Sequence, residues 1–185
     1  MSYYRFIYFI LSSLLLSACG YQYGTGVALA PYTSITIPYV KNDLDGRMTA
    51  ALVKVISAET GLQYEKAGGD LSLMVEILEY ENENIGFRYD RKNDGQLRHS
   101  IIPTETRLFV VALVSLIETA SGKSLAGPAK ITAYVDFDHD YERTRNGVNV
   151  FSLGQLTDYD EAYDAALQPL YRVLSYKIAD FVLSI

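Results

Sequence analysis

The chain has 185 residues, a formal charge of −6 and a pI of about 4.9, with 16 tyrosines, 7 phenylalanines and no tryptophan. This length suits one domain with a real core. The net negative charge and the lack of a basic stripe exclude general nucleic-acid binding. The chain contains two histidines and one cysteine, so few catalytic arrangements built on these residues can form, and we expect no enzymatic activity.

The first 18 residues have the layout of a secretory signal: the cation Arg5, an apolar run over residues 6–16, and small residues up to Ala18. The run is shorter than the about 20 residues of a membrane-spanning helix, so we expect residues 1–18 to be removed. Leu-Ser-Ala-Cys, ending at Cys19, resembles the lipobox of bacterial lipoproteins. The resemblance implies that the peptide is cut before Cys19 and that this residue is acylated. The alternative is a buried apolar helix with an incidental cysteine.

Removal of the signal leaves a chain with a charge of −7, because residues 1–18 carry Arg5 and no acid. A single acyl chain binds a bilayer marginally, whereas several hold stably, so a triacylated Cys19 would fix the protein to a membrane. Gly20 stands where an aspartate is linked to inner-membrane retention in lipoproteins, and the resemblance therefore implies the outer membrane. Residues 19–34 hold three glycines and Pro31, which favours a lipidated tether. Residues 35–185 are expected to form one domain.

The domain begins with a short strand over residues 35–40, and Pro38 predicts that this strand is at a sheet edge or ends there. A helix is predicted over residues 45–60, because apolar residues recur at helical spacing. Gly61 is a typical residue to end it. The apolar stripe of this helix consists of Met48, Leu52, Val55 and Ile56.

Three strands are predicted next. The first begins at Leu71 with one apolar face, and its phase slips at residues 78–80, which indicates a β-bulge. Asn93-Asp94-Gly95 is a strong hairpin signal and leads to a strand over residues 104–118, where residues 108–114 are apolar without a break. Such a run is expected to be covered on both faces. The third strand alternates over residues 130–141.

The last predicted element is a helix that begins with a capping box, Asp158 and Glu161, and keeps helical spacing almost to residue 185 despite Pro169. The predicted fold is therefore α+β. It is a two-layer sandwich of order β-α-β-β-β-α, with a mainly antiparallel four-stranded sheet packed against two helices.

Two polar clusters are candidates for contact with ligands. Four cations gather at the tip of the hairpin near Phe87 and Tyr89, a combination that suits an amphiphile with anionic headgroups. A solvated hairpin with charges that prevent aggregation is the alternative. The four lipopolysaccharide-contact candidates are Arg88, Arg91, Lys92 and Arg98.

The second cluster is Asp136, Asp138 and Asp140, with His139 between them. In a strand the carboxylates share a face but are spread along it, and the glycine of a calcium loop is missing. A solvent-exposed face is favoured over weak calcium binding, and no metal or cofactor is expected beyond the covalent lipid. His139 is expected to point to the opposite face.

Together these features resemble the LptE family of lipopolysaccharide-assembly lipoproteins: Cys19-Gly20-Tyr21 after a lipobox, a strand with proline, an amphipathic helix, two hairpins and a long final helix. The resemblance implies a non-enzymatic outer-membrane lipoprotein that plugs the LptD β-barrel, assists its assembly and helps lipopolysaccharide reach the outer leaflet. It also implies that a partner covers one face of the continuous apolar strand. The partner-facing candidates are Leu108, Val110, Ala112 and Val114.

Three other functions stay open at this point. The chain is also compatible with a pilot or adaptor lipoprotein for another envelope secretion or assembly complex. A lipid- or metal-binding module that acts alone is the second. An envelope hydrolase that depends on His99 or His139 is the third.

Overall fold

The computed structural model describes residues 29–91, 97–139, 144–145, 148–149 and 158–185. Within these residues, helices cover one face of a mixed β-sheet, which confirms the predicted α+β fold. In chain order the elements are β1 (Ser34–Thr36), α2 (Arg47–Glu59), β2 (Gln63–Glu65), β3 (Leu71–Arg91), β4 (Leu97–Glu118), β5 (Ser124–Asp138), β6 (Thr144–Arg145), β7 (Val148–Asn149) and α3 (Tyr159–Leu183).

The main sheet of the described residues has five strands in the order β2-β1-β3-β4-β5, where four were predicted. The additional strand is β2, which is short and polar and therefore carries no apolar alternation. β1 pairs in parallel with both β2 and β3. Parallel neighbours need a crossover connection, and α2 provides it between β1 and β2. β1 lies inside the sheet and not at its edge. It ends at Thr36, shortly before Pro38, so the second predicted alternative, a strand that stops at the proline, is the one observed.

Both helices agree with the periodicity of the sequence. α2 buries Met48, Leu52, Val55 and Ile56, as predicted, and is followed by Gly61 at a φ of 68°, a left-handed conformation that favours glycine. α3 begins where Asp158 accepts a hydrogen bond of 2.9 Å from the Glu161 backbone N–H. It continues through Pro169, and the burial of its apolar stripe offsets the cost of about 3 kcal/mol that a proline imposes inside a helix.

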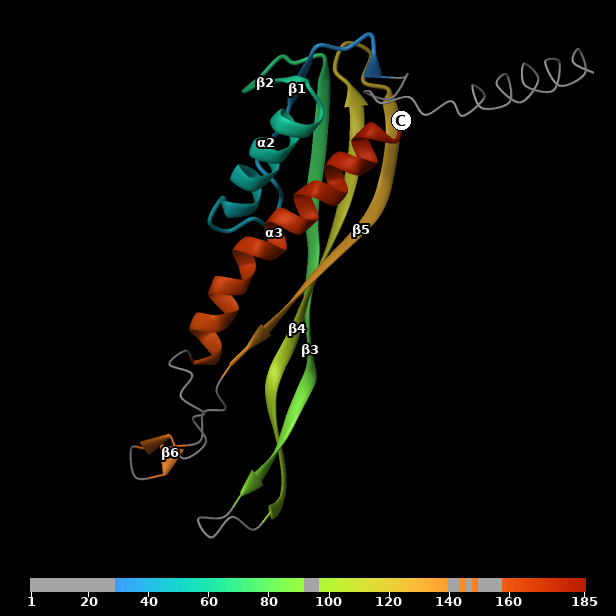
Figure 1. Ribbon diagram of the computed structural model, residues 1–185. Coiled ribbons are helices and arrows are strands. Elements are labelled where there is room, and N and C mark those ends of the chain that lie inside the picture. Colours follow the sequence, from blue (N-terminus) through green and yellow to red (C-terminus); the bar gives the residue numbers. More distant parts are fainter. Residues whose placement is uncertain (1–28, 92–96, 140–143, 146–147, 150–157) are drawn as a thin grey trace, which may run out of the picture.

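β3 and β4 form a long antiparallel pair. The predicted bulge is confirmed, because the register shifts between Ile77 and Glu79 and leaves Leu78 between them. β4 begins at Leu97 and not at residue 104 as predicted, and β3 continues to Arg91. The predicted turn at residues 93–95 lies outside the described residues. Figure 1 shows this pair projecting beyond the N-terminal end of α3. We call residues 86–91 and 97–103 the ribbon.

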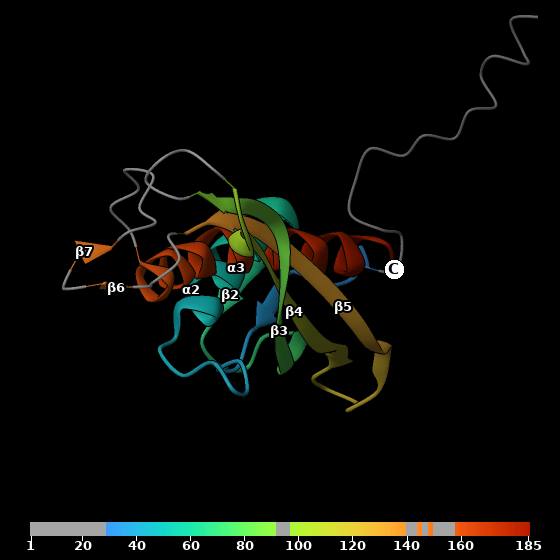
Figure 2. The ribbon, with the colours of Figure 1, turned by 90° about the horizontal axis from the view of Figure 1, so that it is seen from below.

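The core lies between the two helices and the sheet. Its strand side comes from alternate residues of β3 and β4, and its helix side from the apolar stripes of α2 and α3. β5 presents Ala133 to this core, with Ile131, Val135 and Phe137 packed against it, as its alternation predicted. From β3 to β5 the strands rotate relative to one another (Figure 2), the usual twist of a β-sheet.

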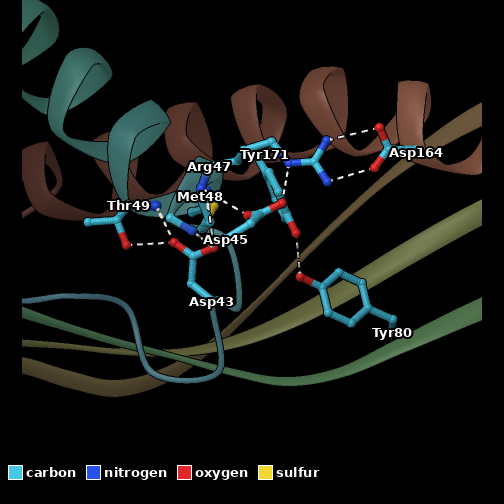
Figure 3. Close-up of polar contacts among 9 residues, drawn as sticks. Asp43, Asp45, Arg47, Met48, Thr49, Tyr80, Asp164 and Tyr171 are labelled. Atoms are coloured by element: carbon cyan, nitrogen blue, oxygen red, sulfur yellow. Dashed lines mark hydrogen bonds and ion pairs between the residues drawn. The ribbon is translucent and has the colours of Figure 1, made fainter.

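Polar contacts fasten the helices to each other and to the sheet (Figure 3). Arg47 of α2 reaches Asp164 of α3, with Nη2 2.7 Å from Oδ1. The hydroxyl oxygens of Tyr80 on β3 and Tyr171 on α3 are hydrogen-bonded at 2.8 Å. Burial, which has the largest effect, and this hydrogen bond both raise the pKa of Tyr80. Both tyrosines therefore stay neutral and join the two layers.

The buried carboxylate of Asp43 caps the start of α2 (Figure 3). It accepts hydrogen bonds from the backbone N–H groups of Gly46, Met48 and Thr49, the last at 2.8 Å. The Thr49 hydroxyl also donates to Asp43 at 2.6 Å and accepts from the Val40 N–H. These bonds satisfy the donors that the first turn of a helix leaves free and join the helix to the preceding loop.

None of the helices among the described residues has the length and apolar character needed to cross a membrane.

Candidate docking surfaces

Some of the predicted contact residues lie beyond what the structure describes. Cys19 and Lys92 fall outside the described residues, and the predictions for them stay predictions. Arg91 ends β3 and Arg98 lies near the start of β4, so both belong to the ribbon. The structure therefore places the backbone of three candidate cations on the ribbon, with Arg88 as the third.

One face of the ribbon is apolar and exposed. Phe87, Tyr89 and Ile101 are 57%, 63% and 61% exposed. Phe87 lies opposite Pro103 and Tyr89 opposite Ile101, so the four side chains share one face. Arg88 pairs with Ile102 on the opposite face, and its side chain is partly buried. The structure thus brings the two aromatic rings together with Ile101 but separates Arg88 from them.

The partner-facing assignment on β4 is wrong. Leu108, Val110, Ala112 and Val114 are all 0% exposed and belong to the core beneath the helices. The other face of the strand carries Phe109, Val111 and Leu113, which are partly exposed. Because residues 108–114 are apolar throughout, the sequence contains no alternation that distinguishes the two faces; only the packing of α2 and α3 does.

On the face of the sheet opposite the helices, β3, β4 and β5 carry a set of side chains that the sequence analysis did not single out. We call the surface formed by Phe109, Val111 and Leu113 of β4, Tyr134 of β5, and Glu79, Glu81 and Glu83 of β3 the open face. The register pairs Phe109 with both Glu81 and Tyr134, and Val111 with Glu79. An apolar stripe along β4 is therefore bordered on one side by carboxylates.

Beside this stripe, Arg107 is held in a fixed position. Its Nε and Nη2 lie 2.7 and 2.8 Å from the two carboxylate oxygens of Asp136, and its guanidinium lies 4.5 Å from the centre of the Tyr134 ring. The hydrogen bonds from Arg107 hold the pKa of Asp136 below its ordinary value. The Phe109 ring packs 5.7 Å from the Tyr134 ring, centre to centre. Two rings and a guanidinium thus form an ordered, partly exposed cluster.

Glu79, Glu81 and Glu83 occupy alternate positions on β3, and all three are exposed. In the part of the chain that the structure describes, neither Glu79 nor Glu81 forms an ion pair. By contrast, Glu76 lies 2.6 Å from Lys41. The alternating glutamates at 79, 81 and 83 were the signal in the sequence that could have predicted a solvent-facing row.

The acidic residues at the end of β5 do not gather into a metal-binding group among the residues described. Asp136 is engaged by Arg107, and among the described residues no group of three or more histidine, cysteine, aspartate or glutamate side chains could hold a metal ion. Asp140 lies outside the described residues. His139 is 4% exposed, with Nε2 2.8 Å from the Thr106 hydroxyl and its ring packed on Tyr159. It points away from the exposed Asp136 and Asp138, as predicted.

An open groove lies between α2 and α3. Alanines and Pro169 form much of its lining, and Lys54 and Arg172 add exposed cations. Arg172 lies over the Tyr176 ring at 5.8 Å. Arg47 and Asp164, which also line the groove, are bound to each other.

The fold and these surfaces define a two-layer α+β module with one uncovered sheet face and a projecting ribbon among the described residues. No family model matches the chain, and no curated protein matches it by sequence. The solved structures to which the chain is similar include lipoproteins of three bacteria.

A minor lipoprotein from Acinetobacter baumannii is 14% identical, with a TM-score of 0.49 over 83% of this chain and 92% of that one. A putative lipoprotein from Caulobacter crescentus is 10% identical, with a TM-score of 0.49 over 81% of this chain and 88% of that one. Rare lipoprotein B from Shewanella oneidensis is 14% identical, with a TM-score of 0.43 over 82% of this chain and 92% of that one. No functional conclusion for this chain follows from likenesses at these TM-scores.

Proposed function

We propose that the chain is an outer-membrane lipoprotein, acylated at Cys19, that plugs an LptD-like β-barrel, assists its assembly and helps lipopolysaccharide reach the outer leaflet. The observation that carries the proposal is the single cysteine of the chain, placed directly after Leu16, Ser17 and Ala18 at the end of an apolar signal. A cysteine at that place is suited to receive lipid, and the lipid places the folded domain beside a membrane.

The arrangement of the domain supports a function by contact. Helices cover one face of the sheet, whereas Phe109, Val111 and Leu113 on the opposite face are partly exposed. Partly exposed apolar side chains on one sheet face are suited to burial against the wall of a larger protein. The ribbon extends beyond the helices and presents Phe87, Tyr89 and Ile101, which suit the acyl chains of a lipid.

Affinity capture tests the proposal. The tagged, lipidated full chain is captured from outer membranes dissolved in a mild detergent, and an unrelated outer-membrane lipoprotein with the same tag is the control. A large β-barrel of the LptD type should be recovered with this chain and not with the control. Recovery of a secretin or of an inner-membrane complex in its place would instead support a pilot or adaptor function.

Charge reversal at Arg91 of the ribbon and at Lys92, the next residue in the chain, should weaken binding of lipopolysaccharide. Each cation near an anionic lipid surface contributes about 1 kcal/mol, so R91E/K92E should weaken binding by at least about tenfold. The matched control is K54E/R172E, which reverses two exposed cations of the α2–α3 groove and should leave the affinity unchanged. The measurement is a titration of the purified chain with lipopolysaccharide. Equal affinities for wild type and R91E/K92E would reject the ribbon as a lipid contact.

A further inference from the structure

The open face combines two features that seldom stabilise an isolated domain. Its centre is the apolar stripe of β4, of which Val111 lies opposite Glu79 on one side and Thr132 on the other. The rings of Phe109 and Tyr134 adjoin this stripe, and Tyr134 is 48% exposed. The parts of these side chains that stay in water contribute little to folding, but they contribute to binding once a partner covers them.

Within the described residues Glu79 and Glu81 form no ion pair, whereas Glu83 lies opposite Arg107. Glu79, Glu81 and Glu83 are spaced two residues apart on one strand face, so neighbouring carboxylates are roughly 7 Å apart along the strand. Like charges at this spacing repel each other, weakly in water and more strongly when water is removed. A partner that covered Glu79 and Glu81 without supplying positive charge would leave these two carboxylates unpaired, which is costly.

The fixed cluster of Arg107, Tyr134 and Phe109 points to a protein as the partner. Arginine and tyrosine side chains that are already ordered lose little conformational freedom on binding, and both residue types are enriched among those that dominate protein interfaces. Arg107 is ordered by its two hydrogen bonds to Asp136. Anionic lipid headgroups, by contrast, would meet the carboxylates of Glu79 and Glu81.

We propose that the open face docks a protein surface that presents lysine or arginine side chains to the glutamate row and apolar side chains to the stripe of β4. Where that protein is the β-barrel, the inference rests on the proposed function and names the face of the domain that meets the barrel wall. The ribbon then serves the lipid and the open face serves the protein. The two surfaces carry opposite charge, so each disfavours the ligand of the other.

A charge reversal with a matched control tests the inference. E79K/E81K changes two exposed residues of the row, and E59K/D180K makes the same change in charge near the C-terminal ends of α2 and α3. Both variants should fold, because the first changes two exposed side chains and makes positions 81 and 83 an opposite-charge pair, and the second places cations where helix dipoles favour them. In affinity capture with the lipidated full chain, E79K/E81K should recover at least about tenfold less barrel, since opposed like charges cost several kcal/mol. E59K/D180K should recover as much as wild type.

Photo-crosslinking provides a second measurement that requires no change of charge. A photoreactive phenylalanine analogue replaces Val111 on the open face or, as the control, Ala58 on the exposed side of α2. The Val111 position should crosslink to a segment of the barrel that contains lysine or arginine, and the Ala58 position should not. Reversing those partner cations to glutamate should restore recovery of the barrel by E79K/E81K.

The outcomes separate this inference from the proposed function. If wild type and E79K/E81K recover equal amounts of barrel and Val111 gives no crosslink, the docking surface is overturned while the plug function stands. If wild type recovers no barrel, but Val111 crosslinks to a lysine- or arginine-bearing segment of another identified protein and charge exchange restores that complex, the docking surface stands and the plug function fails. A crosslink from Val111 to lipopolysaccharide would also overturn the inference.

Discussion

A Cys19→Ala chain should carry no acyl groups and should keep residues 1–18 attached. In the lipobox pattern the thiol receives lipid before the signal is cut, and alanine offers no sulfur for the thioether. Anchoring through acyl chains should be lost with it, because each buried methylene of an acyl chain contributes about 0.8 kcal/mol to membrane binding. We expect the acylated, processed form to disappear almost completely. Mass spectrometry of the N-terminal peptide measures both acylation and cleavage.

The control for this experiment is Ser13→Ala, which keeps the apolar run and the cysteine. It should be processed and acylated as in wild type. If wild-type protein in cells still carried residues 1–18, or if Cys19 were found without acyl groups, the lipoprotein assignment would fail. The plug function, which depends on it, would then lose its main support.

Replacement of Asp43 by alanine should lower the free energy of unfolding by about 2–4 kcal/mol. Asp43 is 3% exposed and accepts three backbone N–H groups at the start of α2, together with the Thr49 hydroxyl. Alanine would leave these donors unsatisfied at a buried site, and loss of a helix cap alone typically costs about 1 kcal/mol. Urea denaturation of the non-acylated chain measures the change.

Two further substitutions make this prediction specific. Asp43→Asn keeps one carbonyl oxygen but turns an NH₂ group toward donors, so its loss should be intermediate. Asp45→Ala removes a carboxylate whose contacts with Arg47 are exposed, and the effect should stay below about 1 kcal/mol. If Asp43→Ala were no more destabilising than Asp45→Ala, the network drawn in Figure 3 would not fix the start of α2.

Local features with one dominant cause could be predicted from the sequence. The stripes of α2 and α3 follow from helical spacing, and the ends of these helices follow from Gly61 and Asp158. The bulge at Leu78 follows from a change of phase along β3. Each of these signals depends on residues close together in the chain.

Features that depend on distant residues could not be predicted in the same way. β2 has no apolar pattern, and it becomes a strand because α2 brings it beside β1. The pleat of the ribbon places Arg88 and Phe87, which are neighbours in the chain, on opposite faces once both belong to a strand. The composition of the hairpin suggested a cluster of cations and rings, and the pleat separates Arg88 from those rings.

The sequence by itself predicts the signal and its cysteine, and it determined the two helices, the succession of the long strands along the chain and the α+β class. The tertiary structure decided which face of β4 is available to a partner, because residues 108–114 are apolar on both faces and only the packing of α2 and α3 buries Leu108 rather than Phe109. It also decided that Glu79 and Glu81 border that stripe, because the register of β3 and β4 places them opposite Val111 and Phe109. The physical reason is that burial and register depend on contacts between segments far apart in the chain, which no local pattern encodes.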